Sequence, residues 1–351
     1  MRKNLTLANC SAQVSHSSGA CVTLERTMQP SNELDYFADL DVLHVMFWYE
    51  KRTSISKIID NLMTNARQVR QAVVSFPDFQ LDLAPILNET QPKIIHLHYG
   101  GEHPQSEFLK RLSYKPRIVH TVHTPASVPS IFADIADRIV CIDEFRLRIN
   151  PGAKSVWIEN SVDVSGIPRH TPNQNGICNA LRFSADQMQP ALLDLFARLD
   201  TKSYFYGADE FLAFSSEHNN YLCEYAKQFP NIECLPYCHD LERRMIGHSF
   251  FTYYVQNNNN PLWCHGLNVM EAVSLGLPVV TLKRGQLGQQ YIVHGHNGYF
   301  VNNDEEFLGY CKQILENTGL YLELCANASR HADRVTNSMP QKYQEMYLSI
   351  L

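Results

Sequence analysis

Residues around position 270 have the types and spacing needed to hold a phosphorylated ligand. Gly266 opens an apolar run of helical spacing over residues 267–273, and a Leu-Gly pair that favours a helix end follows. A helix that begins there presents unpaired amide groups and a partial positive charge, both of which suit a phosphate. Glu271 lies four residues after Leu267, on the same helix face. Its carboxylate could therefore accept hydrogen bonds from ribose hydroxyl groups while the amides hold a diphosphate.

Basic residues elsewhere could complete a site for group transfer. His98 and His123 each stand at the end of an apolar run of strand length, and ligands bind beyond the carboxyl ends of parallel strands. Arg182 offers a fixed charge that suits a diphosphate leaving group. Lys283 and Arg284 follow a further short strand and could add positive charge. The structural alternatives are a satisfied core histidine for His123 and ordinary surface side chains for the charged residues.

The elements that must position these residues alternate between strand and helix. Apolar runs of strand length cover 40–49, 94–99, 117–123 and 138–142 in the first half, and 204–207, 250–255 and 278–282 in the second. Helical patterns lie between the first four, at 55–72, 106–112 and 131–136. Strands separated by helices predict parallel sheets covered on both faces. The polar, proline-bearing stretch 166–176 is the best linker between two such domains.

The stretch 261–301 resembles the nucleotide-sugar site of retaining GT-B glycosyltransferases of the GT4 type. The residues that match the family pattern in order and without gaps are Gly266, Leu267, Glu271, Ala272, Gly276, Pro278, Val279, Val280, Gly295 and Gly298. One position departs from the pattern, because the first glutamate of the family's E-x7-E pair falls on Trp263. An indole cannot accept a hydrogen bond or carry charge.

The resemblance covers most of the chain. The first half is similar to the family strand that ends in H-x-H, at His96 and His98, and to the next strand, whose last histidine, here His123, lines the donor sugar in the family. In the second half, Arg182 falls where the family has the arginine of G-R-L, and Gln187 occupies the position of its usual lysine. The loss of that lysine motivates the hypothesis that Lys283 or Arg284 supplies the missing positive charge.

The resemblance implies an α/β chain with the GT-B fold, in which two Rossmann-like parallel-sheet domains face each other across a cleft. The expected domains are an acceptor-side domain over 1–168, a nucleotide-sugar-binding domain over 177–335, and a C-terminal helix over 336–351 that crosses back to the first domain. The expected catalytic residues are His123, Arg182 and Glu271. The residues expected to bind the donor are Gly266, Leu267, Asn268, Lys283, Arg284 and Gly285.

The function implied is a retaining, metal-independent hexosyl- or pentosyltransferase. It would move a sugar from a nucleoside-diphosphate sugar, with UDP favoured, to a hydroxyl group of a glycan, a lipid-linked or another acceptor. No metal ion is expected, because the start of the helix after Gly266 and the charge of Arg182 would stabilise the leaving diphosphate. The nucleotide sugar is a co-substrate, so no other cofactor is expected. Trp263 leaves an unusual donor, compensation by other groups, or loss of activity open. Two alternatives therefore stand: an enzyme that glycosylates hydroxylated bases in DNA, and a degenerate, non-catalytic partner protein.

Composition fits two domains of ordinary size. The chain has 351 residues, of which 44% are hydrophobic and 19% charged. Residues 1–170 carry 18 basic and 18 acidic residues, whereas 171–351 carry 12 and 18, so the net charge of −6 belongs to the second half. This balance does not indicate a nucleic-acid-binding face, although nucleic acid stays open as an acceptor.

The cysteines and the absence of long apolar stretches bear on location. Ten cysteines lack paired spacing, and the only cluster, Cys234, Cys238 and His239, lacks a fourth zinc ligand. Thiols without a disulfide framework predict a reducing cytoplasm. No stretch is long and apolar enough to cross a membrane, and the polar first twenty residues do not form a signal peptide. We therefore expect a cytoplasmic protein, with peripheral membrane association left open.

Overall fold

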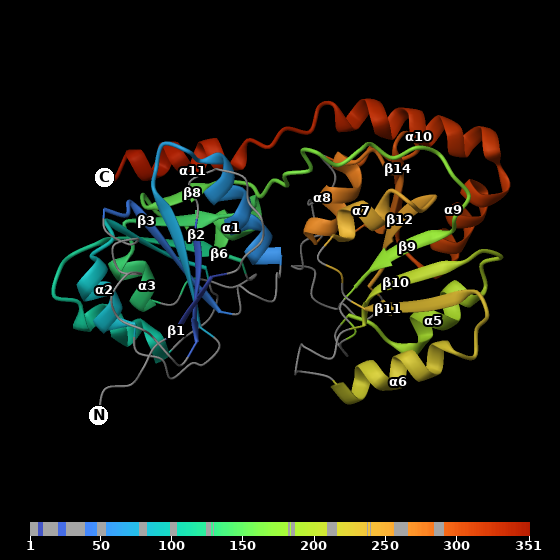
Figure 1. The fold of residues 1–351 in the computed structure, drawn as a ribbon. Helices are drawn as coiled ribbons and strands as arrows, with labels where there is room; N and C mark the ends of the chain where they lie inside the picture. The colour runs from blue at the N-terminus through green and yellow to red at the C-terminus, as the bar shows by residue number, and fades with distance from the viewer. Residues whose placement is uncertain are drawn as a thin grey trace. The chain divides into compact units, whose positions relative to one another are not determined.

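The structure, a computed structural model, divides into two compact units, each with its own sheet and core (Figure 1). The first unit comprises residues 1–161 and 337–351, and the second comprises 162–336. The residues that the structure describes are 6–9, 20–25, 39–47, 54–76, 83–98, 104–123, 128, 130–181, 183, 187–208, 216–236, 238, 240–255, 266–283 and 291–351. The segment 166–176, predicted as a linker, lies within the second unit.

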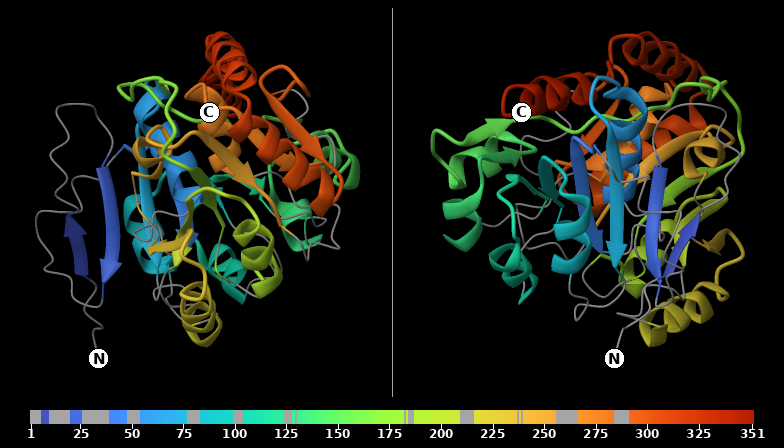
Figure 2. Two further views of the ribbon diagram at one scale, coloured as in Figure 1. Left: turned by 90° about the vertical axis from the view of Figure 1, so that its right-hand side faces the viewer. Right: turned by 60° about the vertical axis from the view of Figure 1, so that its left-hand side comes forward.

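The first unit contains an eight-stranded sheet of order β1-β2-β4-β3-β5-β6-β7-β8. Its strands are β1 (Thr6–Asn9), β2 (Ala20–Glu25), β3 (Val42–Phe47), β4 (Gln71–Phe76), β5 (Ile94–Leu97), β6 (Arg117–Val122), β7 (Arg138–Cys141) and β8 (Ser155–Trp157). All neighbouring pairs are parallel except β1 and β2, which lie antiparallel side by side at one edge (Figure 2). The predicted parallel sheet is therefore present, with an added antiparallel edge.

Strand alternation sends two kinds of side chain to the two faces of this sheet. On one face, Leu43, Val45, Ile95 and Leu97 join an apolar core with α2 (Ala84–Thr90) and the 3-10 helix η3 (Pro104–Arg111). The residues between them on the same strands, such as His44 and His96, point to the opposite face. There the sheet meets α1 (Ser54–Asn65) and the C-terminal helix α11 (Met339–Leu348).

One predicted helix of the first unit is too long. The apolar pattern predicted a helix over 55–72, but α1 ends at Asn65 and Gln71 already belongs to β4. The segment from Gln71 to Phe76 is rich in β-branched and aromatic residues, which favour a strand. The other helices of this unit are α3 (Ser130–Ile135) and α4 (Glu144–Ile149), of which α3 agrees with the predicted 131–136.

The second unit contains a six-stranded, fully parallel sheet of order β11-β10-β9-β12-β13-β14. Its strands are β9 (Ile177–Ala180), β10 (Ser203–Ala208), β11 (Ile232–Pro236), β12 (Phe250–Tyr253), β13 (Val279–Leu282) and β14 (Gly298–Val301). Numbered within the unit, this is the order 3-2-1-4-5-6 of the dinucleotide-binding fold. The chain moves outward from β9 in one direction and then returns to start β12 on the other side.

Helices cover both faces of this sheet. Adjacent strand residues alternate between two apolar clusters: Ile177 and Phe250 face one cluster, whereas Cys178 and Phe251 face the other. The first cluster holds α5 (Pro190–Ala197), α6 (Ser216–Ala226), α9 (Asp304–Glu316) and α10 (Thr318–Ala332). The second holds α7 (Leu241–Met245) and α8 (Leu267–Ser274). The α8 helix is the one predicted to follow Gly266.

The last helix, α11, belongs to the first unit although it follows the second in the sequence. Asn337, just before α11, exchanges two hydrogen bonds of 2.8 and 2.7 Å with Asn61 of α1. The amide of Gln68 also donates to the side chain of Gln344 at 2.8 Å. Polar contacts therefore hold α11 on the face of the sheet that carries the histidines.

Candidate functional site

Histidines gather at the point where the first sheet changes its direction of growth. The chain moves from β3 outward to β4 and then returns to β5 on the other side of β3. His44 of β3 and His96 of β5 are direct neighbours in the strand register. His98 and His123 follow the carboxyl ends of β5 and β6. This is the position in an open parallel sheet where ligands bind.

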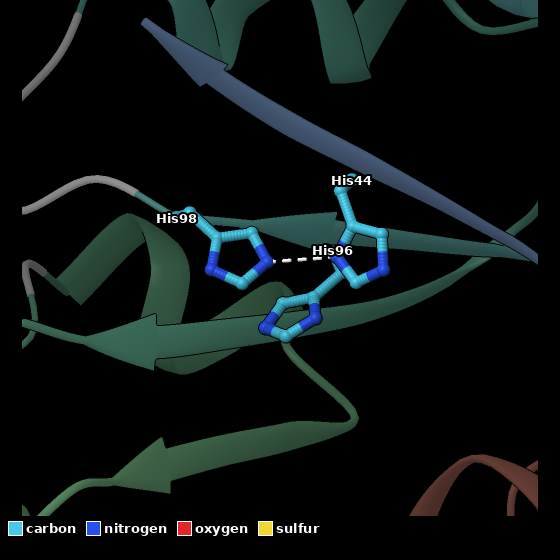
Figure 3. A group of neighbouring side chains, drawn as sticks. All are labelled: His44, His96 and His98. Carbon is cyan, nitrogen blue, oxygen red and sulfur yellow. Dashed lines mark hydrogen bonds between the residues drawn. The ribbon is translucent and has the colours of Figure 1, made fainter. Parts of the chain in front are cut away.

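The side chains of this cluster form a connected series of hydrogen bonds. The Nε2 atom of His44 lies 2.9 Å from Oε1 of Gln71. Its Nδ1 atom lies 2.8 Å from Nε2 of His98, as the dashed line in Figure 3 marks. The Nδ1 atom of His98 in turn lies 3.3 Å from Nε2 of His123. We call Gln71, His44, His98 and His123 the histidine relay, since each member contacts the next. It begins in the core of the first unit and ends at the half-buried His123.

A separate arm of the same cluster uses hydroxyl groups. His96 contacts the hydroxyl of Tyr347 through Nδ1 at 2.6 Å and that of Thr121 through Nε2 at 2.7 Å. The hydroxyl of Thr121 also lies 2.9 Å from that of Tyr343. Both tyrosines come from α11 and are fully buried. The C-terminal helix therefore completes the polar network beneath the site.

Burial keeps these imidazoles neutral. It lowers the pKa of His44 to about 4, although the hydrogen bond that His44 donates to Gln71 partly opposes this shift. It also lowers the pKa of His123 to about 3, with a further contribution from the nearby His120 and the guanidinium of Arg146. The pKa values of His96 and His98 are lowered for the same reason, with added repulsion from the other histidines. Each ring therefore has one N–H group and one bare nitrogen at neutral pH.

His44, His96 and His98 are also close enough to be tested as a metal site. Their ring nitrogens lie within 4.8 Å of one another. However, both nitrogens of His96 already contact hydroxyl groups, and the 2.8 Å between His44 and His98 is a hydrogen-bond distance. Two nitrogens on a tetrahedral zinc ion would stand about 3.3 Å apart, given Zn–N bonds of about 2.0–2.1 Å. The observed distances therefore fit a hydrogen-bonded cluster better than a metal centre.

A buried ion pair holds the main chain at His123. Arg146 donates to the carbonyl oxygen of His123 at 2.9 Å and pairs with Asp143, which caps the start of α4. Both charged side chains are almost fully buried. The ion pair restrains the main chain of His123, while the histidine relay restrains its ring.

The second unit places the start of α8 at its own switch point, between β9 and β12. Gly266 is the N-cap residue, and the side chain of Asn268 donates to the carbonyl of Ala180, the last residue of β9, at 2.6 Å. The Asn268 side chain also accepts from the amide of Val269 at 3.0 Å. Among the described residues, no hydrogen-bond partner is present for the amides of Leu267 and Asn268. The helix start thus offers N–H groups beyond the strand ends.

The predicted site residues of the second unit have different environments. Glu271 lies on the second turn of α8 and is only 2% exposed, so it is not a surface helix glutamate. Leu267 is buried, and Lys283 is exposed directly after β13, with its amide bonded to the carbonyl of Val301 at 2.7 Å. Arg182, Arg284, Gly285 and Trp263 lie outside the described residues.

Sequence reasoning missed two members of the histidine relay. His44 gives one signal, a lone imidazole within the apolar strand 42–47, and Gln71 was assigned to a helix. It also overlooked Asp39 and Asp41, two carboxylates spaced as in a D-x-D cation motif. Asp41 is used structurally, because its carboxylate pairs with Lys93 at 2.7 Å and accepts from the amide of Arg70 at 2.9 Å.

No described helix is long and apolar enough to cross a membrane.

Comparison with solved structures identifies the fold. A crystal structure of Anabaena HepE in complex with UDP and glucose matches with a TM-score of 0.69 at 15% identity, over 89% of this chain and 100% of that one. A glycosyltransferase from Rickettsia africae matches with 0.62 at 14% identity, over 88% and 98%. Sucrose-phosphate synthase from Thermosynechococcus elongatus matches with 0.60 at 15% identity, over 78% and 80%. The chain therefore has the predicted GT-B fold.

Sequence comparisons add nothing to this assignment. No protein-family model matches the chain, and no curated protein matches it significantly. At identities of 14–15%, the structural similarity shows the fold and leaves the reaction to be argued from the site.

Proposed function

We propose that this protein is a retaining, metal-independent glycosyltransferase that uses a nucleoside-diphosphate sugar, in the first place a UDP-sugar. The observation that carries the proposal is the start of α8 at the switch point of a 3-2-1-4-5-6 sheet, with Glu271 buried one turn further on. Nucleotides bind at this position in sheets of this order. HepE, which shares the fold, was crystallised with UDP-glucose.

The start of α8 has the chemistry to bind the donor. The N–H groups of the first turn and the helix dipole stabilise a diphosphate, and Glu271 accepts hydrogen bonds from the ribose hydroxyl groups. The contact between Asn268 and Ala180 ties this helix to the end of β9, two residues before Arg182. The sequence resemblance assigns to Arg182 the role of the cation that stabilises the departing diphosphate.

Lys283 supplies further positive charge at the same edge of the sheet. It follows β13, the neighbour of β12, and forms no ion pair with any described residue. With Gln187 at the position of the lysine in the family pattern, Lys283 or Arg284 neutralises the charge that accumulates on the leaving group. In the proposed reaction, these cations and the amide groups of the helix start stabilise the leaving group without a divalent ion.

The first unit contributes His123 and binds the acceptor. His123 stands at the carboxyl end of β6, beside the switch point between β3 and β5. Its main chain and its ring are both restrained, so it can contact a sugar hydroxyl with little loss of side-chain entropy on binding. The hydroxyl that accepts the sugar belongs to a glycan, a lipid-linked compound or another hydroxyl-bearing acceptor.

A donor-hydrolysis screen tests this function without knowledge of the acceptor. The protein is incubated with a set of UDP- and GDP-sugars, and release of the nucleoside diphosphate is followed, with and without EDTA. We expect hydrolysis of at least one donor, retained in EDTA, and a released sugar whose first-formed anomer matches the donor. No release from any donor would favour the non-catalytic alternative. Activity abolished by EDTA and restored by a divalent ion would contradict the metal-independent mechanism.

A further inference from the structure

Gln71 gives the histidine relay a direction. Its side-chain Nε2 donates to two main-chain carbonyls, those of Leu62 at 3.1 Å and Ala66 at 3.0 Å. Both amide hydrogens are therefore used, and the opposite orientation would set the amide oxygen against two carbonyl oxygens. The oxygen atom Oε1 must consequently face His44, and it can only accept.

This direction passes along the relay because each ring is neutral. His44 has to carry its proton on Nε2 in order to donate to Gln71, so its Nδ1 is bare and accepts from Nε2–H of His98. The Nδ1 atom of His98 is then bare and accepts from Nε2–H of His123. The last ring is left with an unprotonated Nδ1, which has no hydrogen-bond partner among the described residues.

We propose that Gln71, His44 and His98 are positioning residues that hold His123 as its Nε2–H tautomer, so that Nδ1 accepts a hydrogen bond from a hydroxyl group of the substrate. The role toward substrate rests on the proposed function, whereas the tautomer is a property of the protein alone. A ring in this state discriminates between ligands, because it pairs with a hydroxyl donor and opposes a carbonyl or carboxylate oxygen.

The neighbouring hydroxyl arm lacks this property. Thr121, Tyr343 and Tyr347 surround His96 with groups that can donate or accept, so either tautomer of His96 can be satisfied. The two arms lie in the same buried cluster but only the histidine relay starts at a group with a single permitted direction. Thr121 thus provides a matched control for Gln71.

Nitrogen NMR of the full-length protein tests the tautomer directly. In protein labelled with ¹⁵N-histidine at pH 7.5, long-range proton–nitrogen correlations distinguish protonated from bare ring nitrogens, and a His123→Asn variant assigns the His123 signals. We expect protonated Nε2 and bare Nδ1 for His44, His98 and His123. A protonated Nδ1 or a doubly protonated ring at any of these residues would overturn the proposal. The tautomers are read from the unmodified protein, and the variant serves only to assign the signals.

The variant Gln71→Met removes the acceptor at the start of the relay and keeps a side chain of similar size. A buried N–H without an acceptor is unfavourable, so the reversed relay gains population and Nδ1 of His123 becomes partly protonated. Thr121→Val, which removes one hydroxyl from the other arm, should leave the His123 signals unchanged. An unchanged tautomer of His123 in Gln71→Met, or equal changes in both variants, would contradict the relay.

Activity separates this proposal from the proposed function. If a donor is hydrolysed, Gln71→Met should lower kcat/KM by roughly three- to tenfold, the loss expected for one hydrogen bond. Expected tautomers without turnover of any donor would support the relay and reject the transferase. Turnover of a donor by a protein with the other tautomer of His123 would support the transferase and reject the relay. Zinc chloride at one equivalent should not alter the nitrogen signals, whereas coordination shifts at His44, His96 and His98 would mark a metal site and overturn the relay.

Discussion

The switch points of the two sheets occupy the same place in the topology but are built from different chemistry. In the first unit, neutral imidazoles occupy the buried face and bond to one another and to α11. In the second unit, a helix start, a buried carboxylate and an exposed lysine surround the strand ends. In the function that we propose, the first arrangement binds neutral hydroxyl groups, and the second binds a polyanion that carries a ribose. The same topology thus supports two kinds of recognition, because the side chains at the strand ends differ.

The largest expected effect is a difference between the two units in how much stability they lose at acid pH. Unfolded histidines take up protons below about pH 6.5, whereas burial lowers the folded pKa of His44 to about 4. The unfolded state therefore binds more protons within this window, so stability falls as pH drops through it and is constant above it. A histidine in this window costs up to about 1.4 kcal/mol per pH unit. His96, His98 and His123 add to the loss in the first unit.

Hydrogen exchange at a series of pH values checks this difference, after correction for the intrinsic exchange rate. We expect peptides from β5 and β6 to lose protection at higher pH than peptides from β12 and β13. Burial also lowers the pKa of His170, His248 and His331 in the second unit, so that unit loses stability below about pH 6.5 as well. The larger shifts of the clustered histidines make the loss greater in the first unit. Loss of protection in the second unit first would show that the histidine cluster does not dominate acid stability.

The next effect concerns donor binding and should be confined to the second unit. Glu271→Gln replaces a buried carboxylate with an amide and should weaken binding of the preferred donor by about 1–3 kcal/mol, the range for hydrogen bonds to a charged group. Calorimetric titration measures this change. Glu316→Gln, at the exposed end of α9, is the control and should bind normally. Equal affinity in all three proteins would remove Glu271 from the donor site.

The sequence contained enough information for the fold but only for part of the site. Apolar runs at 117–123 and 250–255 correctly predicted strands, because buried parallel strands are continuous apolar segments. The helix predicted to follow Gly266 is also present. In contrast, the helix over 55–72 was predicted too long, because the apolar positions of α1 and β4 run together without a glycine or proline between them.

The histidine relay could not be predicted because its contacts depend on strand order. His44 and His98 are 54 residues apart in the sequence, and their hydrogen bond exists only because β5 inserts beside β3 rather than beside β4. The alternation of a single strand does place His96 and His98 on one face, so the H-x-H spacing signalled that pair. Gln71 carries no sequence signal of its own, since its role depends on the carbonyls of Leu62 and Ala66.

The far end of α8 provides a stability test within the second unit. Gly276 has a φ of +80°, and an added Cβ would lie 3.1 Å from the main chain of Ser329 in α10. Gly276→Ala should therefore lower the free energy of unfolding by about 1–2 kcal/mol through backbone strain and crowding. Gly309→Ala within α9 meets open space and should stabilise by up to about 1 kcal/mol. Thermal or denaturant unfolding compares them, and opposite signs are expected, with donor affinity unchanged in both.

The smallest expected effect is at the start of the same helix. Gly266 is needed there for the space that it leaves to the side chain of Asn268, and not for its backbone conformation. Gly266 has a φ of −60°, which any residue adopts, so alanine there causes no backbone strain. Its Cβ would instead lie 2.5 Å from Oδ1 of Asn268, forcing that side chain away from the carbonyl of Ala180. We expect Gly266→Ala to weaken donor binding by about 0.5–1.5 kcal/mol, the net worth of one hydrogen bond, with little change in melting temperature.

If the alanine acts through Asn268, then Asn268→Ala should have a similar effect, and the double variant should be no worse than either single one. Calorimetric titration of the four proteins forms the cycle. Additive losses would show that Gly266 and Asn268 act on the donor separately, and that the link from α8 to β9 is not what positions the helix start.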